Sequence, residues 1–360
     1  MKMIRPTQTT MRYLSANLVI VLSISLTIFG CSKEEVKDPE TPVYDNSVNV
    51  DLPEGFSPVS STAGSGVTDV DGNSYSSVVL GNGQEWMAQN LKTSKFSNGD
   101  AIAYYGGEIT TITIINPGAN YADGTYNGIP FVGGSGTGGT GDFTVTGGKV
   151  VSVTVANAGS AYSVNDLLDV NDTLLSDTSV AVGSNLALKP ATTWGTMSTP
   201  AWTQYDFDSQ NETDYGKLYN YYTVADARNV CPTGWHVPTD ADWDALTLYL
   251  DPDADTSIVE GQGNFNSQSA YGGGRIKSKS NLWLDPNYYA TDEVNYSALP
   301  GGAADSLGTF DNIQEAASFW SATAVNANDA YTRGVSYGSG RLRKYMADQN
   351  QGTSIRCIKD

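Results

Sequence analysis

The stretch CPTGWHVPTDADWDALTLYL, residues 231–250, carries the clearest local signals in this 360-residue chain. Thr239 stands where a helix N-cap is expected, and Asp242, three residues later, takes the capping-box position. Three apolar residues then recur at the spacing of one buried helix face: Trp243, Leu246 and Leu250. We therefore expect a helix that begins after Thr239, and the segment 218–229 upstream suits another.

Residues 69–103 predict paired strands rather than helix. Asp71-Gly72-Asn73 is a turn signal, and the segment from Tyr75 to Leu80 is strand-like. Asn82-Gly83 can close a hairpin onto the segment Glu85-Trp86-Met87, because this dipeptide favours the tight turns that join antiparallel strands. The sequence thus predicts a hairpin ahead of the helical segments.

Composition restricts the classes of function. There are 39 Asp and Glu residues against 20 Lys and Arg, giving a formal charge of −19. Because nucleic-acid binding needs clustered basic residues, no nucleic-acid partner is expected. His236 is the only histidine, so a single chain cannot build a His-pair metal site, and acid–base chemistry falls to carboxylates. We expect no enzyme and nominate no catalytic residue; His236 itself is expected to bond nearby backbone.

The N-terminus has the features of an export signal. Three basic residues precede an apolar run over residues 14–29. The run ends at Gly30-Cys31, which resembles a bacterial lipoprotein box with cleavage before Cys31 and lipidation of that cysteine. Lys33-Glu34-Glu35 is similar to the signal that sends Bacteroidota lipoproteins to the outer face of the outer membrane. We expect a signal peptide (1–30), a lipid anchor in the membrane and a flexible tether (31–68); a plain secretory signal or an uncleaved anchor is the alternative.

Several longer motifs follow one another along the chain: YGKLYNYY (215–222), GGGRIK (272–277), YSALPGG (296–302), FWSAT (319–323) and SIRCIKD (354–360). With residues 69–103 and 231–243, these blocks resemble the Fibrobacter succinogenes major paralogous domain, a family of bacterial surface and secreted modules. The resemblance implies an α+β, C-type-lectin-like fold, shared broadly with formylglycine-generating enzymes: two helices, a small antiparallel sheet and long loops. It assigns residues 69–105 and 189–360 to this module.

The family resemblance also bears on the cysteines. If Cys31 carries lipid, Cys231 and Cys357 remain as an even pair in an exported, oxidising context. The matching cysteines resemble the long-range bridge of lectin-like domains, which implies a disulfide. The rival interpretation is a reactive pair of the formylglycine-generating type, although neither cysteine has a neighbouring histidine or CxxC partner. Arg356, beside Cys357, is expected to be solvated.

The glycine-rich residues 106–188 interrupt the module. ITIINPGANY (112–121) and VTVANAGSAY (153–162) align with each other, and each combines an alternating strand with an Asn-x-Gly turn and a tyrosine. A phosphate-binding loop would need a following helix with a lysine, which is missing. We expect an inserted all-β repeat domain.

Metal sites receive little support. The alternating acids of residues 251–255 look like part of a calcium loop, but Thr256 and Gln262 occupy the positions where an EF-hand requires Gly and Glu. Asp285-Pro286-Asn287 and residues 319–321 are only near misses to the calcium-dependent sugar motifs of lectins. No metal or other cofactor is assigned; calcium is unsupported.

Loop aromatics and arginines supply the candidate ligand contacts, because binding hot spots favour these residue types. The candidates are Trp283, Tyr288, Tyr289, Arg333, Tyr337, Arg341 and Arg343. With Arg275 and Tyr331 nearby, they suggest a basic island for a carboxylate or an acidic glycan. The motif tryptophans are expected in the core instead: Trp86, Trp235, Trp243 and Trp320.

The leading hypothesis is a non-catalytic binding or adhesion module on a lipoprotein that faces the cell exterior, with a glycan or surface protein as ligand. Two alternatives stay open. The first is a structural subunit that assembles into a surface appendage through the β repeat. The second is an oxidase of the formylglycine-generating type, which would need both cysteines as free thiols.

Overall fold

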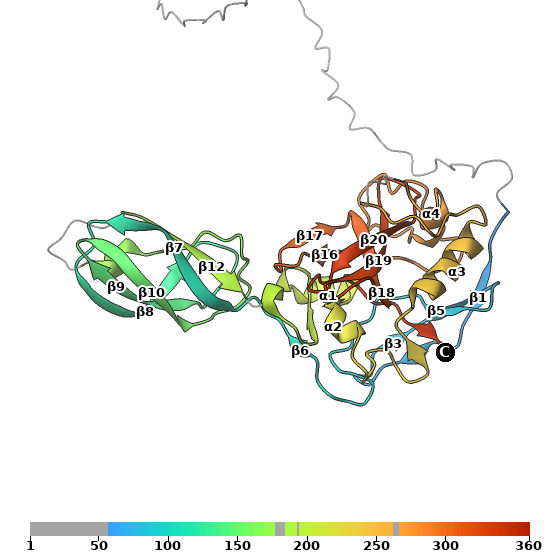
Figure 1. Cartoon of the computed structure of the whole chain (residues 1–360), viewed down its shortest axis with the longest axis horizontal. Helices are drawn as coiled ribbons and strands as arrows, with labels where there is room; N and C mark the ends of the chain where they lie inside the picture. The colour runs from blue at the N-terminus through green and yellow to red at the C-terminus, as the bar shows by residue number, and fades with distance from the viewer. Residues whose placement is uncertain (1–56, 177–183, 193, 262–265) are drawn as a thin grey trace, which may run out of the picture. The chain divides into compact units, whose positions relative to one another are not determined.

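The computed structural model describes residues 57–176, 184–192, 194–261 and 266–360 (Figure 1). The predicted signal peptide, Cys31 and most of the predicted tether lie outside these ranges. The end of the predicted tether is structured, because β1 (Ser61–Ala63) pairs with β4 and β2 (Val67–Thr68) pairs with β3. Within the described ranges, no helix is both long and apolar enough to cross a membrane.

The predicted α+β, C-type-lectin-like fold is wrong, because the protein is mostly β, with 39% strand and 12% helix. The expected helix over residues 218–229 is replaced by a short strand, β14 (Leu218–Tyr219), and a single helical turn, α2 (Tyr221–Val224). β14 is held extended by its pairing with β13, and Asn220 then caps α2 by accepting a hydrogen bond from the Thr223 amide. Asn229, with a positive φ of 56°, turns the chain before Cys231.

The second predicted helix is confirmed as α3 (Asp240–Leu250). The Thr239 side chain accepts a hydrogen bond from the Asp242 amide, and the Asp242 carboxylate accepts one from the Thr239 amide, which completes the capping box. Trp243, Leu246 and Leu250 are all fully buried, so the i, i+3, i+7 face is the one that packs on the core. The other α-helices are short: α1 (Ser209–Tyr215) and α4 (Gly272–Ile276).

One five-stranded sheet joins three distant parts of the chain in the order β1-β4-β5-β21-β15. The predicted hairpin is confirmed: β4 (Ser77–Leu80) turns into β5 (Glu85–Met87), while β3 (Ser74–Tyr75) precedes it. The C-terminal strand β21 (Ile358–Lys359) lies between β5 and β15 (Trp235–His236). The N-terminal hairpin is therefore an integral part of the fold built by residues 201–360.

A second five-stranded sheet has the order β17-β16-β18-β19-β20. Its strands are β16 (Gly301–Ala304), β17 (Phe310–Ile313), β18 (Ala316–Ala324), β19 (Asp329–Ser336) and β20 (Arg343–Asp348). A small third sheet places β13 (Ala201–Thr203) between β14 and β6 (Ala103–Tyr104). The described residues also form three short 3₁₀ helices, at Asp172–Leu175, Trp194–Thr196 and Tyr205–Phe207.

The four motif tryptophans lie in the hydrophobic core, as predicted: Trp86, Trp235, Trp243 and Trp320 are all buried. The rings of Trp86 and Trp243 lie 4.8 Å apart, so the hairpin and α3 meet through aromatic packing. A neighbouring apolar cluster contains Cys231, Cys357 and Trp320, which links the disulfide to the second sheet.

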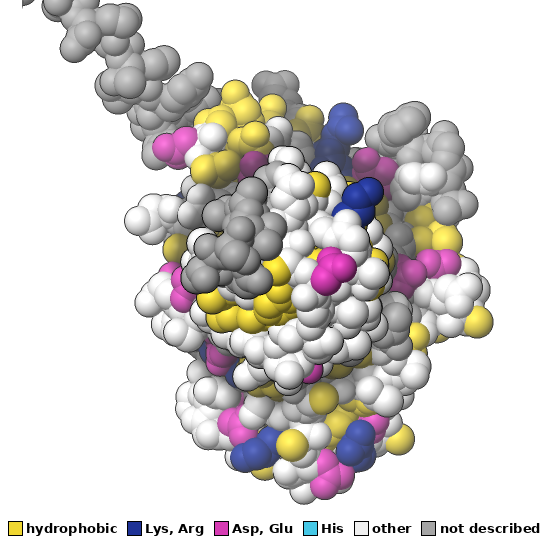
Figure 2. Space-filling view, turned by 90° about the vertical axis from the view of Figure 1, so that its left-hand side faces the viewer, with side chains coloured by type: hydrophobic (Ala, Val, Ile, Leu, Met, Phe, Trp, Pro, Cys, Tyr) yellow, Lys and Arg dark blue, Asp and Glu magenta, His cyan; other side chains and the backbone are white. Residues whose placement is uncertain are grey.

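The predicted β repeat forms strands with a core of its own. These strands are β7 (Ile109–Ala119), β8 (Gly124–Val132), β9 (Thr140–Thr146), β10 (Lys149–Asn157), β11 (Asp169–Val170) and β12 (Ser184–Thr192). They form the sheets β10-β9-β8-β11 and β12-β7. Figure 2 views the side on which these strands are drawn; most of that face is uncharged, with a few hydrophobic patches and scattered charges.

Both repeat copies have the same turn. The Asn116 side chain accepts a hydrogen bond from the Gly118 amide at 3.1 Å, and Asn157 accepts one from Gly159 at 3.0 Å. Both glycines have φ near 60°, which explains why glycine stands there in each copy. The tyrosine that ends each copy is buried in the core.

Candidate functional site

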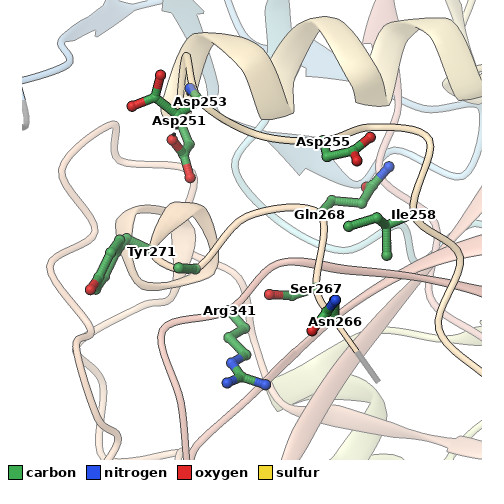
Figure 3. A pocket seen from close by; sticks show the side chains of 10 residues that line it. Asp251, Asp253, Asp255, Ile258, Asn266, Ser267, Gln268, Tyr271 and Arg341 are labelled. Carbon is green, nitrogen blue, oxygen red and sulfur yellow. Dashed lines mark hydrogen bonds between the residues drawn. The ribbon is translucent and has the colours of Figure 1, made fainter. Parts of the chain in front are cut away.

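A pocket of about 420 Å³ lies beyond the C-terminal end of α3. Its polar lining includes Asp251, Asp253, Asp255, Gln268, Tyr271 and Arg341. Figure 3 shows the three aspartates along one side, with Arg341 across from them. The pocket is thus built from the loop after α3, the segment before α4 and the loop between β19 and β20.

The acidic loop is organised by its own hydrogen bonds. Asp251 accepts one from the Asp253 amide at 3.2 Å and another from the Ser269 hydroxyl at 2.6 Å. Asp255 accepts the amide and hydroxyl of Ser257. The three carboxylates point in different directions (Figure 3), and the described residues contain no group of three or more acids, histidines or cysteines placed to hold a metal. The structure gives calcium binding at this loop no support.

Gln268 forms a buried part of the pocket wall and is only 2% exposed. Its side-chain Nε2 donates to the Thr256 carbonyl at 2.7 Å, and its backbone carbonyl accepts a hydrogen bond from the Asp255 amide at 2.9 Å. These bonds fix the acidic loop against the segment that leads into α4.

Next to the pocket lies a group of three tyrosines, Tyr271, Tyr288 and Tyr289, which we call the tyrosine surface. The ring of Tyr289 lies 6.2 Å from that of Tyr271 and 6.3 Å from that of Tyr288. Tyr288 is 46% exposed and Tyr289 37% exposed. Because Tyr271 also lines the pocket, the tyrosine surface and the pocket are continuous.

Glycines in α4 allow the loops of the site to approach closely. A Cβ on Gly273 would overlap the carbonyl of Arg341, and one on Gly274 would overlap the carbonyl of Tyr289. The Gly274 amide also lies 2.9 Å from the Gly340 carbonyl, which it hydrogen-bonds. The GGG sequence therefore serves the packing of the two loops that carry Tyr289 and Arg341.

Lys277, at the end of α4, ties the same loops together from inside. Its fully buried Nζ donates to the carbonyls of Tyr288 at 2.7 Å, Ser336 at 2.9 Å and Ser339 at 2.9 Å. Burial lowers the pKa of Lys277 to about 7. The three carbonyls match the three N–H groups of an ammonium, so Lys277 joins the Tyr288 loop to the loop that precedes Arg341.

The backbone of Tyr289 is strained. Its φ is +63°, a region that bulky side chains rarely adopt, and its Cβ lies close to Gly340. Such strain costs about 1–3 kcal/mol and persists only where the surroundings impose it, often at binding sites. The strained conformation holds the Tyr289 ring between the rings of Tyr271 and Tyr288.

The structure brings together some of the predicted ligand contacts and buries others. Tyr288, Tyr289 and Arg341 lie at or beside the pocket, and the half-buried Tyr337 accepts the Tyr288 amide through its carbonyl at 2.7 Å. Trp283, by contrast, is a core residue whose Nε1 donates to the Ala298 carbonyl.

The predicted basic island does not exist. Arg333 is fully buried and bonds Asp240 at 2.7 Å and Asp244 at 2.8 Å, which fastens β19 to α3. Arg343 pairs with Glu260 at 3.0 Å. Arg275 is also buried and donates to the Leu250 carbonyl. These arginines serve the fold because carboxylates and carbonyls from distant segments meet them.

The predicted disulfide is confirmed: Cys231 and Cys357 are bonded, and both are fully buried. The neighbouring Arg356 is not solvated as expected but is fully buried, donating to the Asn90 side chain at 2.8 Å and the Ser297 carbonyl at 2.6 Å. Burial lowers its pKa to about 10. His236 bonds the Asp360 side chain at 2.7 Å rather than backbone.

Sequence reasoning missed Gln268, Tyr271 and Lys277. The motif GGGRIK (272–277) was visible; Tyr271 directly precedes its glycines, and Lys277 is its last residue. A triple glycine directly after an aromatic residue was therefore an available signal for close loop packing, whereas nothing in the sequence around Gln268 marked it.

The described residues form a β-rich module with a long-range disulfide and a pocket built from loops. The family model for the Fibrobacter succinogenes major domain matches residues 178–359, half of the chain, and the protein belongs to this family. The hairpin over residues 74–87 falls outside the matched range although it pairs with β21. Searches of curated proteins and of solved structures find no match.

Proposed function

We propose that this protein binds a glycan through the tyrosine surface and the adjoining pocket, without catalysing a reaction on it. The observation that carries the proposal is the group of partly exposed tyrosine rings held rigidly beside a polar pocket. A sugar ring presents C–H groups that pack on aromatic faces and hydroxyls that bond polar side chains. Binding sites of this kind combine aromatic area with a few fixed polar groups.

Preorganisation supports this proposal. The α4 glycines, the Lys277 bonds and the strained Tyr289 backbone hold the loops before any ligand arrives. A site that is already ordered loses less conformational entropy on binding. Backbone strain of this kind often occurs at binding sites.

The charge of the site favours a neutral or basic ligand. Three aspartates face the pocket with one arginine, Arg341, and the whole chain carries −19. An acidic glycan would meet repulsion from this field. The proposed ligand is therefore a neutral or amino-bearing glycan, in place of the acidic glycan that the expected basic island suggested.

The cellular setting remains part of the proposal. The lipoprotein-like pattern that ends at Cys31 supports an outer-membrane protein that faces the exterior, and the disulfide supports an oxidising compartment. The bonded, buried cysteines also remove the support for an oxidase that needs two free thiols.

A glycan array probed with the purified protein tests the proposal. We expect binding to neutral or amino-bearing glycans, and at least tenfold weaker binding of Tyr288→Ala to the best of them. Leu248→Ala, which removes an equally exposed side chain on α3, is the matched control and should stay within twofold. Binding to none of the glycans, or equal binding by the wild type and Tyr288→Ala, would contradict the proposal.

A further inference from the structure

A second exposed aromatic group lies on the small sheet formed by β6, β13 and β14. Figure 1 labels β6 of this sheet. The parallel pairing of β6 and β13 places Tyr104 opposite Trp202. Their ring centroids are 4.6 Å apart with a 41° tilt. Tyr104 is 45% exposed, whereas Trp202 is half-buried and packs partly on the core. We call this pair the β6–β13 shelf.

The buried ammonium of Lys217 supports the Trp202 ring of the shelf. The Lys217 Nζ lies 4.3 Å from the centre of the Trp202 ring and is nearly buried. It is held by Glu212 Oε1 and by the Lys92 carbonyl, each at 2.6 Å. Because these contacts immobilise the ammonium, its cation–π contact stabilises the position of the Trp202 ring, and the Tyr104 ring packs against Trp202.

Polar groups border the exposed ring. A Cβ on Gly106 would lie 2.9 Å from Tyr104 Cε1 and 3.0 Å from Glu108 Oε1, so the glycine leaves room for the ring and the carboxylate to lie close together. Burial and the nearby carboxylates of Glu108 and Glu212 raise the pKa of Tyr104. Glu108 therefore borders the Tyr104 ring, while Glu212 and Lys217, bonded to each other, lie beside the adjoining Trp202 ring.

We propose that the β6–β13 shelf is a second glycan-binding site, at which one sugar ring packs on Tyr104 and donates hydroxyl hydrogen bonds to Glu108 and Glu212. The Lys217 ammonium beside Trp202 disfavours a cationic ligand, and the carboxylates disfavour an anionic one. A neutral sugar satisfies both conditions. The shelf shares no residue with the tyrosine surface, so this proposal stands on its own observations.

Two separate sites on one protein change how a polymer binds. A long polysaccharide that contacts both sites gains affinity through effective concentration, without any new contact. A short oligosaccharide gains no such advantage. The β6–β13 shelf therefore predicts stronger binding to polymers than to their short fragments.

Affinity electrophoresis in gels containing starch, mixed-linkage β-glucan, xylan or mannan tests the shelf. We expect at least one polymer to retard the wild-type protein, and Tyr104→Ala to weaken that retardation at least fivefold. Tyr104→Phe keeps the ring and should stay within twofold of wild type. Tyr104→Ala should also weaken binding in a Tyr289→Gly background, which separates the two sites.

The outcomes distinguish the two proposals. If Tyr104→Ala no longer binds a polymer that Tyr289→Gly still binds, the result supports the shelf and contradicts the tyrosine surface. If Tyr289→Gly loses polymer binding and Tyr104→Ala keeps it, the result contradicts the shelf. Retardation by none of the four polymers, or equal retardation of the wild type and Tyr104→Ala, would overturn the shelf as a glycan site. A protein ligand captured through Tyr104 with no polysaccharide bound would overturn it as well.

Discussion

Removing the Cys231–Cys357 disulfide should destabilise the protein strongly. The bond joins residues 126 positions apart, and the chain-entropy model gives about 5 kcal/mol for a loop of this length. Natural domains are stable by only about 5–15 kcal/mol, so this single bond accounts for a large share of the total. The double variant Cys231→Ala/Cys357→Ala is preferable to serine, because a hydroxyl in this fully buried site would lack a guaranteed partner.

Urea unfolding at equilibrium, followed by tryptophan fluorescence, measures the effect. We expect the free energy of unfolding to fall by about 5 kcal/mol in the double alanine variant, and by a similar amount in wild-type protein unfolded under reducing conditions. The reduced wild type is the matched control, since it keeps both sulfur atoms and loses only the covalent link. A loss below 1 kcal/mol in both samples would show that the bond does not restrain the unfolded chain as argued.

Three further predictions concern the site and the sheet. Tyr289→Gly should be about 1 kcal/mol more stable than Tyr289→Ala in urea unfolding, because only glycine relieves the +63° φ. Both variants should lose binding at the tyrosine surface but keep binding at the β6–β13 shelf, and equal stability of the two variants would refute the strain. Lys277→Met should weaken glycan binding at least fivefold and speed amide exchange in residues 336–340, since three loop hydrogen bonds are lost; unchanged binding and exchange would refute the positioning role. Partial burial raises the pKa of Glu85, but hydrogen bonds from Lys359, Ser77 and Ser65 outweigh this effect and lower the pKa to about 2. Because the pKa of Glu85 is higher in the unfolded chain, ionised Glu85 stabilises the fold by roughly 3 kcal/mol above pH 4.5, and this stabilisation disappears as the pH falls towards 2. The difference in free energy of unfolding between wild type and Glu85→Gln should therefore close over that pH range. A difference that stays constant with pH would contradict the lowered pKa of Glu85.

Local signals in the sequence predicted local structure well. The capping box at Thr239 fixed the start of α3, and the Asn82-Gly83 turn fixed the hairpin. Both Asn-x-Gly turns of the repeat formed as expected. Each of these features depends on residues that are neighbours along the chain, so no tertiary information was needed.

Features that depend on distant partners were not predictable in this way. Tyr219 pairs with Thr353 and with Trp202 of β13, and these long-range contacts hold Leu218–Tyr219 as a strand where the expected helix would begin. The sequence predicted Arg333 as a ligand contact, but in the structure it bonds two aspartates of α3, Asp240 and Asp244. Composition reveals an arginine but not the carboxylates that the fold brings to it.

The candidate site falls between these cases. Tyr288, Tyr289 and Arg341 were singled out by residue type, and the structure places them at or beside one pocket. Their arrangement depends on the close approach at Gly273 and Gly274, which no local pattern describes.

Hydrogen–deuterium exchange of the purified protein, with and without the best glycan from the array, tests the central claim most directly. We predict slower exchange on binding in residues 266–271, 287–290 and 337–342, the segments that form the pocket and the tyrosine surface. Protection confined to other segments, or none at saturating glycan, would show that the ligand does not bind there.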